Sequence, residues 1–158
     1  MLSVQVTTIT LNKITLAGSA DGKKNAFYTV GTIDLSKTSS EGLWTQSSSD
    51  TKQNFDWFNG PQSLTSTSAS NPETNYLFVI PQNFESGHDD LYVIVDYTIN
   101  YNTGVQSTMK STVTSKIEKN FLQGKAYMIN LTVGLTPIQF NAEVAEWGTV
   151  DGKDITWN

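Results

Sequence analysis

The stretch that decides the fold reads Tyr127-Met128-Ile129-Asn130-Leu131-Thr132-Val133-Gly134-Leu135. Its large apolar residues occupy every second position, which is the period of a β-strand that buries one face. Thr136-Pro137 ends the run, because proline donates no ladder hydrogen bond and favours extended geometry in the residue before it. A second alternation over residues 138–144 closes on Glu146-Trp147-Gly148. The two runs predict a hairpin with an apolar inner face that other strands must cover.

The clearest hairpin lies upstream of this stretch. Apolar residues alternate with others from Leu91 to Tyr101, and Asn102-Thr103-Gly104 is a turn with glycine in the position that favours a left-handed conformation. Beyond the turn, Met109, Val113 and Ile117 fall on one face of a long strand. The pattern predicts two long antiparallel strands.

Other strand regions show a weaker pattern. The alternation over residues 4–16 changes phase before Ile14, which predicts a bulge or a break. Residues 27–35 are interrupted at Gly31, Phe55 and Trp57 are spaced for a short strand, and residues 63–75 read as a surface loop. The continuous apolar run Tyr76–Ile80 predicts a strand that is covered on both sides or lies in the middle of a sheet.

No stretch has a sustained helical period, and the best helical candidate, residues 116–122, spans barely two turns. The sequence therefore predicts an all-β fold. We expect an antiparallel β-sandwich of about seven or more strands, Greek-key or transthyretin-like, with little helix. Residues 1–158 are interpreted as a single domain, with residues 149–158 as a possible tail strand.

Composition narrows the class of protein. The chain has no cysteine, which excludes disulfides and thiolate-ligated metals. Its net charge is −5 and it contains no arginine, and these two features argue against nucleic-acid partners. Frequent serine and threonine with few charges are typical of exported β proteins. Met1–Gln5 shows no signal-peptide pattern, and no apolar run approaches the roughly 20 residues of a membrane span. If the protein is exported, we expect its targeting segment to have been removed from this chain.

The sequence lacks the combinations of residues that a catalytic or metal site needs. His88 is the one histidine, and its neighbours Asp89 and Asp90 would diverge on an extended chain. The chain contains no Gly-x-Ser-x-Gly elbow, and Glu143 and Glu146 read as exposed charges. We predict a protein that is not an enzyme, with no catalytic residue, no metal and no cofactor.

The tryptophans leave two interpretations open, because aromatic rings either fill a core or form an exposed platform for sugars. Trp57 and Phe58, in an irregular polar setting, are the best candidates for contact with a ligand, with Trp44 as a further candidate. Trp157 is a second exposed candidate near the end of the chain.

Three segments near the C-terminal end carry a family resemblance. Gly124-Lys125-Ala126-Tyr127 followed by the alternating strand, Pro137-Ile138-Gln139-Phe140 and the closing Glu146-Trp147 resemble the C-terminal end of the fimbrillin-like proteins of Bacteroidales. Two earlier places resemble the same family, in the expected order: Val30-Gly31-Thr32-Ile33-Asp34-Leu35 followed by Leu43-Trp44, and Leu77-Phe78-Val79-Ile80-Pro81-Gln82.

The resemblance implies a subunit of surface pili or a related lipid-anchored adhesin at the outer membrane. Such subunits have two β-sandwich domains and assemble by β-strand addition, in which a strand from the next subunit fills a groove left by a removed N-terminal strand. This chain has the length of one domain, no lipid-accepting cysteine and no arginine for an arginine-specific protease. We therefore interpret it as the family's C-terminal domain or a trimmed form, with membrane contact only through a lipid anchor outside this chain.

Two hypotheses of function follow. The first is a structural pilus subunit or adhesin whose partners are other pilus subunits. Its edge candidates are Val4 and Val6 in segment 4–11, and Ile155 and Trp157 in tail 150–157, although the tail could also fold back on its own sheet. The second is a surface module that binds a host glycan or protein through Trp57, Phe58 and Trp44.

Overall fold

The computed structural model describes residues 7–37, 44–46, 51–64, 76–102, 106–131 and 143–147. Within them the chain forms twelve strands and no helix, and every strand pairing is antiparallel. The predicted all-β, sandwich-like fold is confirmed. Residues 116–122, the best helical candidate, instead end one strand and form a second short one.

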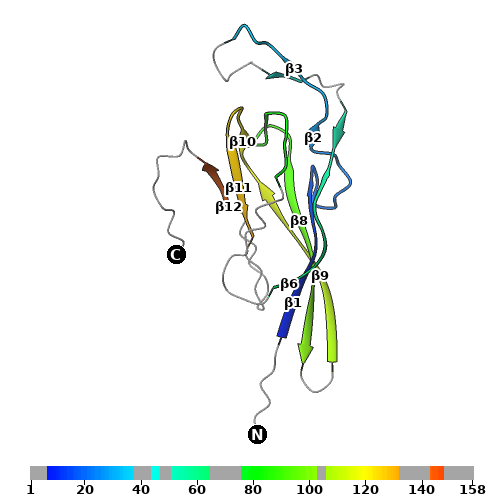
Figure 1. The fold of residues 1–158 in the computed structure, drawn as a ribbon. Coiled ribbons are helices and arrows are strands. Elements are labelled where there is room, and N and C mark those ends of the chain that lie inside the picture. The colour runs from blue at the N-terminus through cyan, green and yellow to red at the C-terminus, as the bar shows by residue number, and fades with distance from the viewer. Residues whose placement is uncertain are drawn as a thin grey trace.

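A four-stranded sheet forms the body of the molecule (Figure 1). Its strands, in spatial order, are β6 (Phe55–Leu64), β1 (Thr7–Ala17), β8 (Leu91–Asn102) and β9 (Gln106–Ile117). The β8–β9 pair is the hairpin predicted from the alternation, and β1 enters the sheet between β8 and β6. We call this sheet the central sheet.

The other strands form four short pairs. The pair that the opening stretch predicts is present: β11 (Ala126–Asn130) and β12 (Glu143–Trp147) run antiparallel. The remaining pairs are β2 (Phe27–Tyr28) with β5 (Lys52–Gln53), β3 (Thr32–Ile33) with β4 (Trp44–Thr45), and β7 (Gln82–Asn83) with β10 (Asn120–Phe121).

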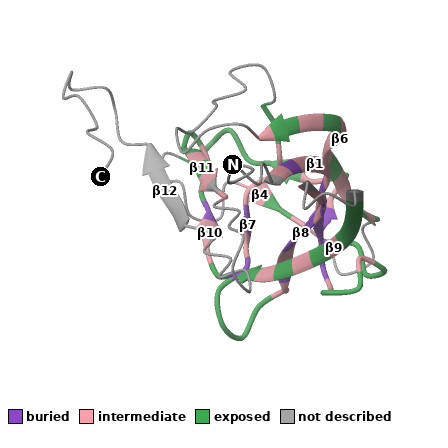
Figure 2. Cartoon of the chain, turned by 90° about the horizontal axis from the view of Figure 1, so that it is seen from below, coloured by how far each residue is buried: buried purple, intermediate pink, exposed green. Residues whose placement is uncertain are grey.

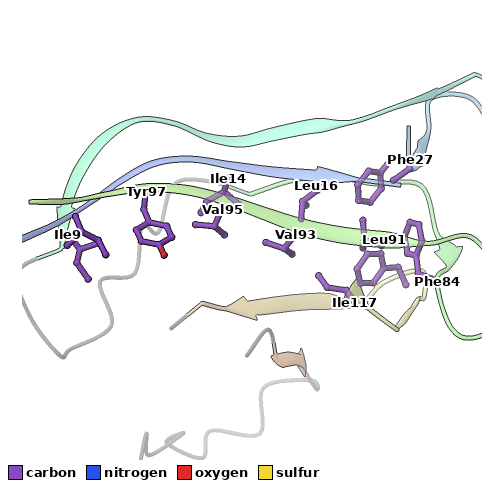
Figure 3. Packing of buried hydrophobic residues seen from close by; sticks show 13 residues of the cluster. Ile9, Ile14, Leu16, Phe27, Phe84, Leu91, Val93, Val95, Tyr97 and Ile117 are labelled. Carbon is purple, nitrogen blue, oxygen red and sulfur yellow. The ribbon is translucent and has the colours of Figure 1, made fainter. Parts of the chain in front are cut away.

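The core lies on one face of the central sheet. Along β8 every second residue is buried, as the period of two requires, and β1 adds Ile9, Ile14 and Leu16 (Figure 3). Aromatic rings cover this face, one from the start of β6 and the others from the short strands and loops. Their ring contacts run in series: Phe55 to Phe27, Phe27 to Phe84, Phe84 to Phe121, and Phe121 to Tyr127.

The predicted break in the first strand is a bulge. Leu11 pairs with Tyr97 and Lys13 with Asp96, so Asn12 is an extra residue on β1. The Asn12 Nδ2 donates a hydrogen bond of 2.8 Å to the Thr98 Oγ1, so the side-chain amide of the extra residue has a partner on β8. The bulge restores the alternation, so that Ile14 and Leu16 face the same core as Ile9.

One predicted strand is wrong. Residues 76–80 belong to no strand, and they are covered on one side only. Leu77 and Val79 pack against the core, whereas Tyr76 and Phe78 are 72% and 91% exposed. An apolar run without polar alternation suggested burial on both sides, but the chain provides no second layer over Phe78 among the described residues. The predicted loop 63–75 also begins later, because Ser63 and Leu64 belong to β6.

Candidate functional site

The strand β9 forms one edge of the central sheet. It pairs with β8 along its full length, and within the described residues no strand pairs with its other side. Half of the backbone N–H and C=O groups of such a strand point away from the sheet, where they can bind another extended chain. We call this side of Gln106–Ile117 the β9 edge.

The β9 edge is long and regular. Twelve residue pairs join β8 and β9 from Leu91–Ile117 to Asn102–Gln106 without one register shift. The strand contains no proline, and its three threonines, Val113 and Ile117 are β-branched residues that favour a pleated backbone. Its unpaired groups therefore repeat evenly, as an incoming strand requires.

Exposure along β9 increases toward the turn end of the hairpin. Ile117 is buried at one end, whereas Ser107, Thr108, Met109 and Lys110 are all exposed at the other (Figure 2). On the core side of the strand, small serines at 107, 111 and 115 alternate with larger apolar residues. Because serine is small, these three positions would crowd the side chains of an added strand less than the apolar residues between them.

The opposite edge of the sheet, β6, has features that protect an edge from pairing. Its register against β1 shifts twice, Gly60 has a φ of 144°, and Pro61 has no N–H to donate. Between β1 and β6, the Lys13 Nζ lies 2.9 Å from the Asp56 Oδ1. The hydrogen bond from Lys13 to this carboxylate is the main reason why the pKa of Asp56 is lowered. The two edges are therefore not equivalent, and β9 is the better acceptor.

Charge on β9 is confined to its outer face, away from the core. Lys110 and Lys116 lie there, opposite Thr98 and Tyr92 on β8. The Lys116 Nζ lies 3.0 Å from Asp90 and 3.1 Å from Glu118, and hydrogen bonds to these two carboxylates raise the pKa of Lys116. Natural edges are often blocked by a charged side chain that points inward. Between Ser107 and Ile117 the core side of β9 carries none.

Other polar features of the described chain are weaker candidates. No group of three or more possible metal ligands lies together in the described part of the chain. A shallow hollow of about 410 Å³ lies beside the Asn12 bulge, and four of its polar side chains bind one another, because Thr112 Oγ1 donates to Asp96 and Asn12 to Thr98. None of the described segments is a helix that could cross a membrane.

The edge candidates predicted from the sequence lie mostly outside the part of the chain that the structure describes. Val4, Val6, Ile155 and Trp157 lie outside the described residues. The described part of the candidate edge 4–11 is contradicted from Ile9 onward, because there β1 pairs with a strand on each side. Ile9, for example, pairs with Leu64 on one side and Ile99 on the other. Sequence alternation identifies a strand but not its neighbours, which is why β9 was not singled out.

The predicted aromatic contacts do not form an exposed platform. Trp57 and Phe58 are half-buried and pack against the core, since the β6 register shifts at this point and brings two neighbouring residues toward it. Trp44 is half-buried on β4, 3.3 Å from where a side chain on Gly31 would begin. Among the residues whose burial is described, the exposed aromatic ones are instead Tyr76 and Phe78, for which the sequence predicted a covered strand.

Comparison with known proteins adds no relative. No family model matches the chain, and neither the curated proteins nor the solved structures contain a significant match to it.

Proposed function

We propose that this protein is a structural subunit or adhesin of a bacterial surface pilus, and that it associates with other subunits by β-strand addition at the β9 edge. The observation that carries the proposal is the twelve-residue edge, which is regular, carries no inward charge and pairs on one side only within the described residues. The segments that resemble fimbrillin-like proteins, among them Gly124–Tyr127, support the same class of protein.

Strand addition suits this edge energetically. An added strand forms one hydrogen bond for each outward backbone group, each with a net value of about 0.5–1.5 kcal/mol, and covers the half-exposed core side of β9. Met109 is 46% exposed there and gains burial. The main-chain bonds supply affinity for any extended chain, and the alternation of small and apolar residues on the core side of β9 favours a complementary pattern of side chains.

The test compares two single lysine substitutions on adjacent exposed residues of β9. Met109→Lys places a charge on the core side, where an added strand would bury it, and Thr108→Lys places the same charge on the outer face next to Lys110. We expect the wild type and Thr108→Lys to form oligomers at high concentration and Met109→Lys to remain monomeric. Size-exclusion chromatography with light scattering measures the mass, and circular dichroism confirms that all three proteins keep the β fold.

A monomeric wild type at every concentration, or equal oligomers in Met109→Lys and Thr108→Lys, would contradict assembly through this edge. Ligand binding through Trp57 and Phe58 gains no support, since both rings pack against the core. We therefore propose no second function.

A further inference from the structure

Asn59 and Gly60 carry a chemistry that the proposed function does not use. They are the one asparagine–glycine step in the chain. Both belong to β6, the edge strand opposite β9, and the Asn59 side chain is exposed. An exposed asparagine that precedes glycine is open to attack by the next backbone nitrogen, because glycine has no side chain that hinders the close approach. The step is therefore a candidate site of covalent modification.

The pairing between β1 and β6 is irregular at this step. Lys13 pairs with Asn59 on one side of the irregularity, and Leu11 pairs with Gln62 on the other. Between these pairs β6 has two residues and β1 has one, so Gly60 has no directly paired residue on β1. The φ of Gly60 is 144°, and a Cβ at this position would meet no atom within 4 Å beyond its chain neighbours. The Gly60 backbone thus lies outside the regular ladder and in open surroundings.

The neighbours of Asn59 leave its side chain on the outer face of the sheet. Trp57 and Phe58 pack against the core, whereas the residues on either side of them, Asp56 and Asn59, are exposed. Lys13 is close to both exposed residues, since it pairs with Asn59 across the strands and its Nζ lies 2.9 Å from the Asp56 Oδ1. Directly paired residues share one face of a sheet. A carboxylate at position 59 would therefore lie opposite a lysine.

We propose that Asn59 is a site of spontaneous deamidation, in which the Gly60 nitrogen attacks the Asn59 side chain. The nitrogen gives its proton to water and bonds to the Asn59 Cγ, while the bond from Cγ to Nδ2 breaks and ammonia leaves with a proton taken from water. The product is a cyclic imide. A second water molecule opens the ring at either carbonyl carbon and gives aspartate or isoaspartate, in which the backbone runs through the former side chain.

Either product places a new negative charge on the β6 edge. Aspartate keeps the backbone and lies opposite Lys13, where an exposed ion pair contributes little to stability. Isoaspartate adds one carbon atom to the backbone of β6, at a point where the register already shifts. A charged side chain on an edge strand discourages pairing with another chain. The modification thus increases the difference between the β6 and β9 edges.

Isotope labelling tests the proposal in the intact chain. The protein is incubated at neutral pH in water that carries the heavy oxygen isotope, and each asparagine that deamidates through an imide takes up one heavy oxygen atom. A protease that cleaves after glutamate then releases the peptide 42–73, because Glu41 and Glu73 mark its two ends. Tandem mass spectrometry assigns the label to a residue, and circular dichroism confirms that the protein stays folded during the incubation.

The same peptide contains a matched control. Asn54 precedes Phe55, its Nδ2 donates to the Gly22 carbonyl at 2.9 Å, and its Oδ1 accepts from the Ala26 N–H at 3.1 Å. We expect the label at residue 59, as a mixture of aspartate and isoaspartate, and none at Asn54. Asn59→Gln should lose the label at this position, because a glutamine side chain has to close a larger ring.

Three results would overturn the proposal. The first is retention of the amide at Asn59 in the folded protein; labelling of the same residue only in urea-unfolded protein would show that β6 protects it. The second is aspartate without isoaspartate, which would mean direct hydrolysis of the amide without attack by Gly60. The third is equal labelling of Asn54 and Asn59, since the reaction would then not depend on the glycine or on the open surroundings at this step.

Discussion

Replacement of Phe84 by alanine provides a sharp test of how the fold is held together. Phe84 is fully buried, and its ring lies 5.5 Å from that of Phe27 on β2 and 5.5 Å from that of Phe121 on β10, measured between ring centroids. Both contacts are close to edge-on, with interplanar angles of 72° and 76°. Phe84 therefore links the short strands that cover the central sheet.

The expected cost follows from these contacts. A Phe→Ala change in a core costs about 3–5 kcal/mol, because apolar burial is lost and the cavity collapses only in part. Each lost edge-to-face pair contributes roughly 0.5–1.5 kcal/mol beyond burial. The upper half of the range is expected here, and this loss is a large share of the ~5–15 kcal/mol by which a typical domain is stable.

Urea denaturation followed by tryptophan fluorescence and by circular dichroism measures the loss. Phe84→Leu is the matched comparison, since it keeps most of the apolar volume and removes only the aromatic geometry, so it should cost about half as much or less. A loss below ~1 kcal/mol for Phe84→Ala would refute the assignment of Phe84 to the core.

Three further predictions concern single residues. Gly18→Ala should cost about 1–3 kcal/mol in urea denaturation, because its Cβ would lie 2.8 Å from the Asn25 carbonyl oxygen; an unchanged midpoint would contradict this contact. Gln82→Leu should cost about 2–4 kcal/mol, measured in the same way. The buried Gln82 amide accepts a hydrogen bond from the Tyr28 N–H at 3.1 Å and donates one to the Ala26 carbonyl at 3.0 Å, and the substitution leaves these two backbone groups without a partner. The hydrogen bond from Ser19, followed by those from Lys23, lowers the pKa of Asp21 to about 2, so its stabilising effect is present above pH ~4 and is lost as the pH falls toward 2. Asp21→Asn should therefore lose less thermal stability than the wild type between pH 4 and pH 2, and parallel curves would contradict the assignment.

The sequence predicted well those features that depend on local pattern. The alternation from Leu91 to Tyr101 became a strand with every second residue buried, and the phase shift before Ile14 became the bulge at Asn12. Both follow from the side-chain period of two, which a reader can count along the chain. The paired strands at Ala126–Asn130 and Glu143–Trp147 were predicted in the same way.

Features that depend on distant neighbours could not be predicted. Nothing in the residues around Ile9 shows that Leu64 and Ile99 flank them, so the prediction of an edge strand there is wrong. The apolar residues from Tyr76 to Ile80 gave no sign that one side stays in solvent, because burial depends on what the rest of the chain places above it. The bulge that turns Trp57 and Phe58 toward the core depends on the register with β1, which local sequence does not encode.

The interior position of β1 has a consequence for how the protein reaches its native state. The β8–β9 hairpin closes through neighbours in sequence, whereas β1 must find β8 and β6 far along the chain before it gains any pairing. Such long-range closure is slow, on the order of milliseconds to seconds for all-β domains, because loop entropy is lost before contacts form. A chain made from its N-terminus exposes Ile9, Ile14 and Leu16 until β8 has emerged. During synthesis, the apolar residues of β1 therefore stay exposed to premature association until the strands on both its sides have been made.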